Sequence, residues 1–264
     1  MKNSAKLMIL IGLVLAVAFS GCLGGGTNET DNTSHFYKNV TLTENDTVVK
    51  FEFTTNPSTG YGWEVTANNT SILNETVNDI TTASTNMTGA PGIHTFSYEA
   101  QSPGTVALNF RYERSFENNS TLEDLTFVIQ VNADNTIEIL SVTTPVGGYL
   151  PLSKNVTLVE SSAAIKMVFA ENPTTGYRWN VSMTPTDVLN MTIDRSEDTA
   201  TGMPGAPSIH TWQFGSLKEG NVSLVFDHNR AFENGSTTET AVFELRTNAD
   251  STIEIRSISL CTKS

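Results

Sequence analysis

The chain has 264 residues, a formal net charge of −13 at pH 7 and only 16% charged residues. A mildly acidic surface of this kind is repelled by phosphate backbones and anionic lipid head groups, so nucleic-acid binding is disfavoured as a function.

The first 22 residues predict an export signal. Lys2 and Lys6 precede an apolar run from Leu7 to Phe19, and small residues then lead to Cys22. This order is typical of a signal peptide, and the Ser-Gly-Cys ending resembles a lipobox, so we expect Cys22 to be lipidated. An uncleaved N-terminal anchor is the alternative, because Phe19 departs from the aliphatic residue of a lipobox. Either anchor predicts an exported protein at the outer face of the cell membrane, with residues 23–35 as a flexible linker.

The cysteine content limits the chemistry of the chain. Cys22 and Cys261 are the only two cysteines. If Cys22 is lipidated, Cys261 is left alone, and neither a disulfide framework nor a thiolate metal site can form. No metal and no cofactor are therefore expected.

The rest of the chain is a tandem duplication. The string NPSTGYGW at 56–63 returns as NPTTGYRW at 172–179, and His94 and Arg114 match His210 and Arg230 at the same offset of 116. Each copy is long enough to bury its own core. We predict two domains, at residues 36–142 and 150–261, joined by a segment rich in Pro and Gly.

The apolar residues of both copies recur at every second position. Val49, Phe51 and Phe53 alternate with polar residues, and Ile165, Met167 and Phe169 do the same in the second copy. A period of two indicates half-buried strands. The predicted fold class is all-β, with two tandem immunoglobulin-like antiparallel β-sandwich domains.

Three stretches between the strands are repeated and lie outside this alternation. In the first, Pro57 restricts its own φ and that of Asn56, while Gly60 can adopt the positive φ that ends a tight turn. The second is GAPGIHTF at 89–96, matched by GAPSIHTW at 205–212. The third is RSFEN at 114–118, matched by RAFEN at 230–234, and an arginine beside an aromatic residue is typical of an interface hot spot.

On these motifs the chain resembles the chagasin-type inhibitors of papain-like cysteine proteases. That family carries the loops Asn-Pro-Thr-Thr-Gly-Tyr/Phe-x-Trp, Gly-x-Gly-Gly and Arg-Pro-Trp, in this order, on a small immunoglobulin-like β-sandwich. The first motif is matched closely in both copies, whereas Pro91 and Pro207 interrupt the second, and Phe116 and Phe232 replace the tryptophan of the third.

The resemblance implies that three loops per domain fill the protease cleft as a wedge. The turn would abut the catalytic cysteine and histidine, the central hairpin would enter the substrate groove, and the third loop would brace the far wall. The implied protease-binding residues are Asn56, Pro57, Ser58, Thr59, Gly60, Tyr61, Gly89, Ala90, Pro91, Gly92, Arg114 and Phe116, with Asn172, Pro173, Thr174, Thr175, Gly176, Tyr177, Gly205, Ala206, Pro207, Ser208, Arg230 and Phe232.

Other interpretations of the same residues stay open. Trp63 and Trp179 are expected in the core, His94 and His210 as packed or capping residues, and the arginines could be solvated strand ends. An enzyme is disfavoured because the sequence shows no metal, nucleophile or phosphate-binding motif. A cell-surface adhesion or glycan-binding module on the same fold is the main alternative.

The two copies differ at the loops. Arg178 stands where the first copy has Gly62, and Ser208 where it has Gly92. We therefore expect the first domain to be the better inhibitor.

Overall fold

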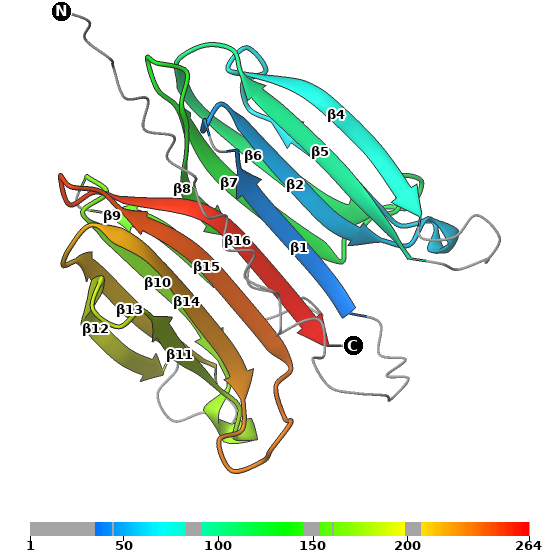
Figure 1. Cartoon of the computed structure of the whole chain (residues 1–264). Helices are drawn as coiled ribbons and strands as arrows, with labels where there is room; N and C mark the ends of the chain where they lie inside the picture. The colour runs from blue at the N-terminus through cyan, green and yellow to red at the C-terminus, as the bar shows by residue number, and fades with distance from the viewer. Residues whose placement is uncertain are drawn as a thin grey trace, which may run out of the picture. The chain divides into compact units, whose positions relative to one another are not determined.

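The computed structural model (Figure 1) describes residues 35–43, 45–82, 91–144, 154–159, 161–198 and 207–263. In these residues every regular element is a β-strand except for two short 3-10 turns, and every strand pair is antiparallel. The predicted all-β class is confirmed. None of the described residues forms a helix of the length and hydropathy that a membrane span requires.

Each copy contributes eight strands and one 3-10 turn. The first copy has β1 (His35–Leu42), β2 (Val48–Thr55), η1 (Pro57–Thr59), β3 (Gly62–Ala67), β4 (Leu73–Thr82), β5 (Gly92–Ala100), β6 (Gly104–Glu113), β7 (Glu123–Val131) and β8 (Ile137–Thr143). The second copy has β9 (Lys154–Val159), β10 (Ala164–Glu171), η2 (Pro173–Thr175), β11 (Arg178–Thr184), β12 (Leu189–Asp198), β13 (Ser208–Ser216), β14 (Gly220–Asn229), β15 (Glu239–Thr247) and β16 (Ile253–Lys263).

The strands form two eight-stranded sheets, and each sheet takes four strands from each copy. Sheet A has the order β11-β14-β15-β16-β1-β2-β5-β4, and sheet B the order β12-β13-β10-β9-β8-β7-β6-β3. The copies are joined where β1 pairs with β16 and where β8 pairs with β9. The sequence predicted the two sandwiches but not that their sheets would run on from one copy into the other.

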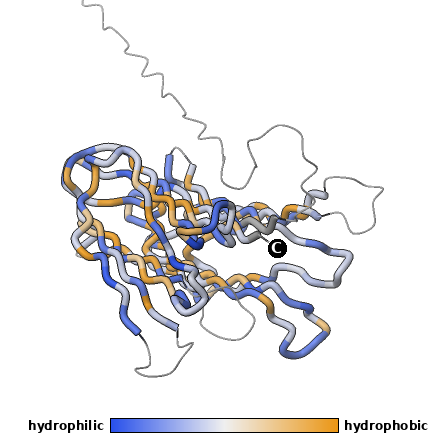
Figure 2. Tube along the Cα trace, turned by 90° about the horizontal axis from the view of Figure 1, so that it is seen from below, coloured by the Kyte–Doolittle hydropathy of each residue, from blue (hydrophilic) through white to orange (hydrophobic). Residues whose placement is uncertain are grey.

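The core lies between the sheets and is rich in aromatic rings. In the first copy, Phe51 of sheet A lies 4.7 Å from Phe110 and 5.1 Å from Phe127 of sheet B, measured between ring centroids. In the second copy, Phe169 of sheet B lies 4.9 Å from Phe226 of sheet A. Hydrophobic and hydrophilic positions alternate along the strands (Figure 2), as the period of two predicts.

Both predicted core tryptophans are confirmed. Trp63 and Trp179 are buried, and their indole nitrogens donate to the carbonyl oxygens of Thr54 at 2.9 Å and Ala170 at 3.0 Å. A buried indole with its N–H satisfied fixes the strand that follows each Asn-Pro turn.

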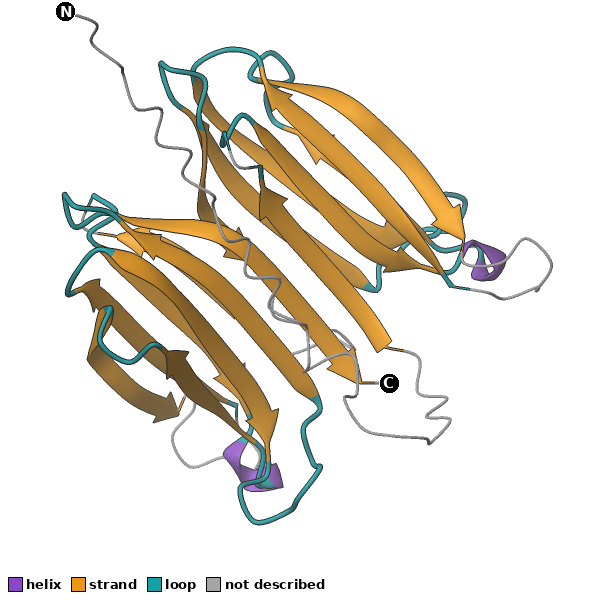
Figure 3. Cartoon of the chain, in the orientation of Figure 1, coloured by secondary structure: helices purple, strands orange, loops and turns teal. Residues whose placement is uncertain are grey.

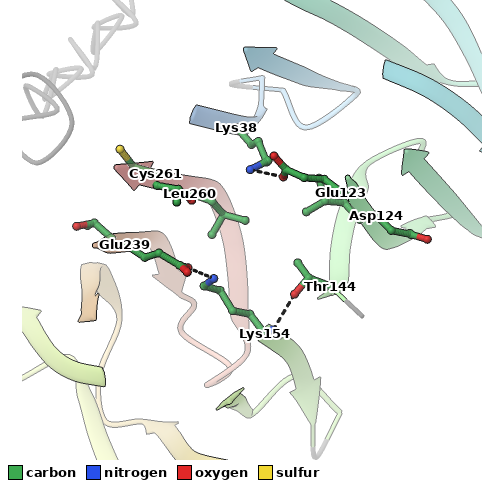
Figure 4. A pocket seen from close by; sticks show the side chains of 11 residues that line it. Lys38, Glu123, Asp124, Thr144, Lys154, Glu239, Leu260 and Cys261 are labelled. Atoms are coloured by element: carbon green, nitrogen blue, oxygen red, sulfur yellow. Dashed lines mark hydrogen bonds and ion pairs between the residues drawn. The ribbon is translucent and has the colours of Figure 1, made fainter. Parts of the chain in front are cut away.

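A pocket lies where the two copies meet (Figure 4), and both of its lysines are paired with glutamates. Lys38 of β1 is buried and lies 2.5 Å from Glu123 of β7. Lys154 of β9 repeats the arrangement with Glu239 of β15. Because these lysines are neutralised by carboxylates of their own copy, the pocket offers little charge to a ligand.

The two cysteine expectations meet different outcomes. Lipidation of Cys22 lies outside the described residues, as do the signal segment and most of the linker. Cys261 of β16 is buried and disulfide-bonded, so the expectation that it is left alone does not hold. A chain with two cysteines cannot carry both a lipid thioether at Cys22 and an intramolecular disulfide at Cys261.

Candidate functional site

The first Asn-Pro stretch forms a closed 3-10 turn at the end of β2. The amide of Thr59 donates to the Asn56 carbonyl at 3.1 Å, and the amide of Gly60 donates to the Pro57 carbonyl at 3.1 Å. The side chains add to this, since the Ser58 hydroxyl donates to Asn56 Oδ1 at 2.6 Å. Gly60 has a φ of 79°, the left-handed value that the sequence predicted for it. The turn is thus held by its own hydrogen bonds at the end of the strand (Figure 3).

The third loop packs directly on this turn. Arg114 Nε donates to the Thr59 carbonyl at 3.2 Å, and the guanidinium carbon lies 4.5 Å from the centre of the Tyr61 ring. Phe116 is 77% exposed and reaches over Gly60, because a Cβ built on that glycine would lie 3.2 Å from Phe116 Cζ. The two loops therefore form one continuous surface that ends in an exposed aromatic ring.

The second copy reproduces this surface. Arg230 Nε donates to the Thr175 carbonyl at 3.1 Å, and its guanidinium carbon lies 4.4 Å from the centre of the Tyr177 ring. Phe232 is 80% exposed, and a Cβ on Gly176 (φ 81°) would lie 3.3 Å from Phe232 Cζ. The turn and the third loop thus have the same arrangement in both copies.

Neither arginine is simply a solvated strand end. Arg114 Nη1 donates to Glu117 Oε2 at 2.8 Å, and Arg230 Nη1 donates to Glu233 Oε2 at 2.9 Å. These hydrogen bonds raise the pKa of both guanidiniums above their ordinary value, so the charge is permanent. Each arginine is held by the turn on one side and by a carboxylate on the other.

A tyrosine of β6 that belongs to none of the three repeated stretches also supports the first turn. Tyr112 Oη accepts the amide N–H of Asn56 at 3.1 Å, and its ring lies 5.5 Å from the Tyr61 ring. The second copy has His228 at this position, 5.4 Å from Tyr177, where burial lowers the pKa of the histidine. The sequence feature that could have indicated this role is the position of Tyr112 and His228, each two residues before the loop arginine on a strand that ends at the site.

The central loop is described only at its base. Gly89, Ala90, Gly205 and Ala206 lie outside the described residues, so their predicted role is not placed. Pro91 and Pro207 are exposed, whereas Gly92 and Ser208 are buried at the first positions of β5 and β13. Gly92 and Ser208 thus form the base of the loop and not its surface.

Strand register places the base of the central loop at the same end as the turn. Gly92 pairs with Thr55, the residue before Asn56, and also with Thr82 at the end of β4. On sheet B, Gly62 of β3 pairs with Glu113, the residue before Arg114. The three predicted stretches of the first copy therefore leave the sheets at one end of the sandwich, and the second copy has the same register.

The two histidines of the central hairpins are packed, as predicted. His94 is buried and stacks on Phe96, with 4.0 Å between ring centroids, and His210 stacks on Trp212 at 3.6 Å. Within the part of the chain that the structure describes, no group of three or more His, Cys, Asp or Glu residues could hold a metal ion. The exposed features of the site are the two phenylalanine rings and the two guanidiniums held against the turns.

Comparison with known proteins finds one family in both copies. The model of the family described as "Chagasin family peptidase inhibitor I42" matches residues 41–131 and 159–246, which together are more than half of the chain. Amoebiasin-2 of Entamoeba histolytica is 37% identical over 73 residues, which cover 27% of this chain and 58% of that protein. The chain thus matches little more than half the length of this relative.

A solved structure is also similar in sequence. The crystal structure of the cysteine protease inhibitor EhICP2 from Entamoeba histolytica aligns with 28% identity and a TM-score of 0.26, covering 36% of this chain and 73% of that one. The family model, matched once in each copy, is the finding that decides identity, and its members are peptidase inhibitors and not enzymes. The chain belongs to the chagasin family of peptidase inhibitors.

Proposed function

We propose that this protein inhibits papain-like cysteine proteases by filling their active-site cleft with the three loops at the end of each sandwich. The observation that carries the proposal is the packing of Arg114 and Phe116 on the Asn56–Gly60 turn, repeated by Arg230 and Phe232 on the second turn. EhICP2 is described as a cysteine protease inhibitor, and we extend that activity to this chain on the strength of family membership.

The physical basis is a recognition surface that is formed before binding. The turn keeps its hydrogen bonds without a partner, and the loop arginine is already fixed, so little conformational entropy is lost when the protease binds. Each surface ends in one exposed ring, Phe116 at 77% exposure in the first copy and Phe232 at 80% in the second, and these rings supply apolar area. Exposed aromatic rings beside arginines contribute most of the binding energy in many interfaces.

The proposed mechanism is steric exclusion. The turn at Pro57–Thr59 would lie against the catalytic cysteine and histidine of the protease, and its closed 3-10 conformation presents no extended peptide bond for cleavage. Phe116 and Arg114 would brace the wall beyond it. The central loop, with Pro91 at its base, would enter the substrate groove.

We also propose that the protein is exported and held at the outer face of the cell membrane by its N-terminal segment. Disulfides persist in oxidising compartments outside the cytosol, and Cys261 is disulfide-bonded, which supports export. Of the two forms of attachment, the uncleaved apolar anchor is compatible with an intramolecular disulfide at Cys261, whereas a lipidated Cys22 is not. Mass spectrometry of the purified chain under non-reducing conditions distinguishes a diacylglyceryl group on Cys22 from an unmodified anchor.

The inhibitory function is tested by titrating active papain with the purified protein and measuring residual hydrolysis of a small peptide substrate. We expect tight, reversible inhibition that is weakened in a variant carrying both Gly60→Val and Gly176→Val. Glycan binding with no effect on papain at any inhibitor concentration would refute the proposal and favour an adhesion module.

A further inference from the structure

The second domain carries a cluster of charges beneath its loops that the first domain lacks. Glu171, at the end of β10, is 0% exposed, and His210 of β13 lies between it and Asp194 of β12. His210 Nε2 donates to Asp194 Oδ1 at 2.6 Å, and Nδ1 lies 3.6 Å from Glu171 Oε1. The second distance is too long for a hydrogen bond, so the contact with Glu171 is electrostatic.

The buried carboxylate of Glu171 has further partners from neighbouring strands. It accepts the amide N–H of Trp179 at 3.0 Å and the hydroxyl of Ser196 at 3.0 Å, and Arg178 Nη1 lies 3.8 Å away. Arg178 is exposed, so solvent weakens its effect. His210 is thus the less exposed of the two cations that can balance Glu171.

The cluster joins the bases of two of the three loops. Glu171 is the residue before Asn172, the first residue of the turn. Asp194 and His210 lie on β12 and β13, the two strands that lead into and out of the central loop. A bridge through the His210 ring therefore ties the turn of the second domain to its central hairpin.

In the first domain the equivalent histidine contacts an amide where the second domain has a carboxylate. Thr55 and Asn78 stand in the places of Glu171 and Asp194, and His94 Nε2 lies 2.8 Å from Asn78 Oδ1. Burial lowers the pKa of His94, against weaker opposing effects of nearby carboxylates. At equivalent positions, the two carboxylates that contact the histidine are thus present only in the second copy.

We propose that protonated His210 is a positioning residue of the second inhibitory surface: it holds Glu171 and Asp194 together and thereby fixes the turn at Asn172–Gly176 against the central hairpin, whereas the first surface has no such dependence. This inference rests on the proposed function, which it extends to a difference between the two domains. Inhibition by the second domain is then strongest under acidic to neutral conditions and weakens at higher pH. Inhibition by the first domain does not weaken in this way.

The titration of His210 has the sign that this proposal requires. Burial lowers the pKa of His210, but the carboxylates of Glu171 and Asp194 outweigh burial and leave the pKa above its ordinary value. The bridge is therefore complete below the ordinary histidine pKa of about 6.5 and is lost as the pH rises through the raised pKa of the folded protein. Burial raises the pKa of Glu171, but its contacts with His210, Trp179 and Ser196 outweigh burial and keep the carboxylate ionised.

The test uses the full-length protein with one surface disabled at a time. A Gly60→Val chain reports the second surface, and a Gly176→Val chain reports the first against the same papain preparation, so the pH dependence of the enzyme cancels. Between about pH 6 and about pH 8.5 we expect the inhibition constant of the Gly60→Val chain to rise about tenfold more than that of the Gly176→Val chain. Equal slopes for the two chains would overturn the proposal.

A matched variant separates positioning from folding. Glu171→Thr with Asp194→Asn, in the Gly60→Val chain, gives the second domain the residues that already surround His94 in the first. We expect its pH slope to fall to that of the Gly176→Val chain, while its thermal unfolding midpoint shows that the domain stays folded. A folded variant that keeps the original slope contradicts the role of His210.

A second readout does not depend on inhibition. The turn amides of Thr175 and Gly176 can be compared with those of Thr59 and Gly60, because both turns make the same backbone hydrogen bonds. As the pH rises and the His210 bridge is lost, we expect the exchange rate of the second pair of amides, Thr175 and Gly176, to increase relative to that of the first pair. If neither single-surface chain inhibits papain, the proposed function fails. The ratio of the two exchange rates still tests whether His210 fixes the second turn. A ratio that stays constant across the titration overturns it.

Discussion

Valine in place of Gly60 and Gly176 should abolish most of the inhibition while leaving both sandwiches folded. Each glycine ends a 3-10 turn with φ near 80°, and the backbone N–H of each closes that turn by donating to the proline carbonyl. A branched side chain is strained at this φ, by about 1–3 kcal/mol for each site. The new Cβ would also lie 3.2–3.3 Å from Cζ of the phenylalanine packed above it.

The cost to binding exceeds the cost to folding because two parts of the surface move together. The phenylalanine must leave its position over the turn, and the arginine that donates to the turn carbonyl loses its alignment. Loss of one hot-spot side chain costs about 2 kcal/mol or more, which is a factor of about 30 in the inhibition constant. The nearest atoms to each new Cβ belong to the loop phenylalanine and arginine and not to core residues, so the core is not altered.

Two other glycines serve as controls for this prediction. Gly235 also has a positive φ of 75°, but a Cβ there meets nothing within 4 Å, so Gly235→Val imposes the backbone strain without displacing a ring. Gly62 in β3 has open space and an ordinary φ, so Gly62→Val imposes neither. Inhibition constants for papain and thermal unfolding midpoints are measured for the double variant, for Gly235→Val and for Gly62→Val.

The outcome separates two explanations of the turn. We expect Gly235→Val to resemble the parent in inhibition, and the double variant to lose at least about 30-fold. An unchanged inhibition constant in the double variant would remove the turn from the mechanism. An equal loss in Gly235→Val would attribute the effect to strain in general and not to the packing of the phenylalanines.

Three further predictions concern other parts of the molecule. Phe116→Ala with Phe232→Ala should weaken papain inhibition by about 30-fold yet change the free energy of unfolding by less than about 0.5 kcal/mol, because both rings are exposed; urea titration and inhibition assays check this, and equal losses in both would contradict it. Lys38→Ala should destabilise the fold by about 3 kcal/mol, since it leaves the partly buried Glu123 carboxylate without its cation; a change below about 1 kcal/mol in urea unfolding would show that the pair contributes little. Of the two single-glycine chains, the one that keeps the first surface should inhibit papain more tightly at neutral pH, and a tighter second surface would refute the ranking.

The first turn could be predicted from sequence because its determinants are local. Proline restricts its own φ and that of the preceding asparagine, and glycine permits the positive φ that the structure shows at Gly60 and Gly176. The core parity of Phe51 and Phe53 is equally local, since side chains alternate between the faces of any strand. These features follow from a few neighbouring residues and need no knowledge of the tertiary fold.

Features that depend on contacts between distant residues could not be predicted in this way. Tyr112 is 56 positions from Asn56, yet its hydroxyl accepts the amide of that residue. Glu171 lies outside every repeated motif, and its proximity to His210 follows from the pairing of β10 with β13. The strand order was likewise outside the reach of periodicity, because every strand has the same alternation whichever neighbour it pairs with.

The joining of the sheets gives the duplication a physical rationale. By the offset of the repeat, β9 is the copy of β1 and β16 is the copy of β8, so the β1–β16 and β8–β9 pairings are the same contact made twice. A contact in which the same two surfaces meet twice is the kind found between identical subunits related by a twofold axis. Here it covers four strand edges that would otherwise offer unpaired backbone groups to other chains.

The buried Lys38–Glu123 and Lys154–Glu239 pairs line the pocket at this junction, one from each copy, which is what such symmetry requires. Two copies without a net insertion thus form one pair of continuous sheets. The positions that differ between the copies, Gly62 against Arg178 and Thr55 against Glu171, are free to diverge because they lie on strands that take no part in the junction.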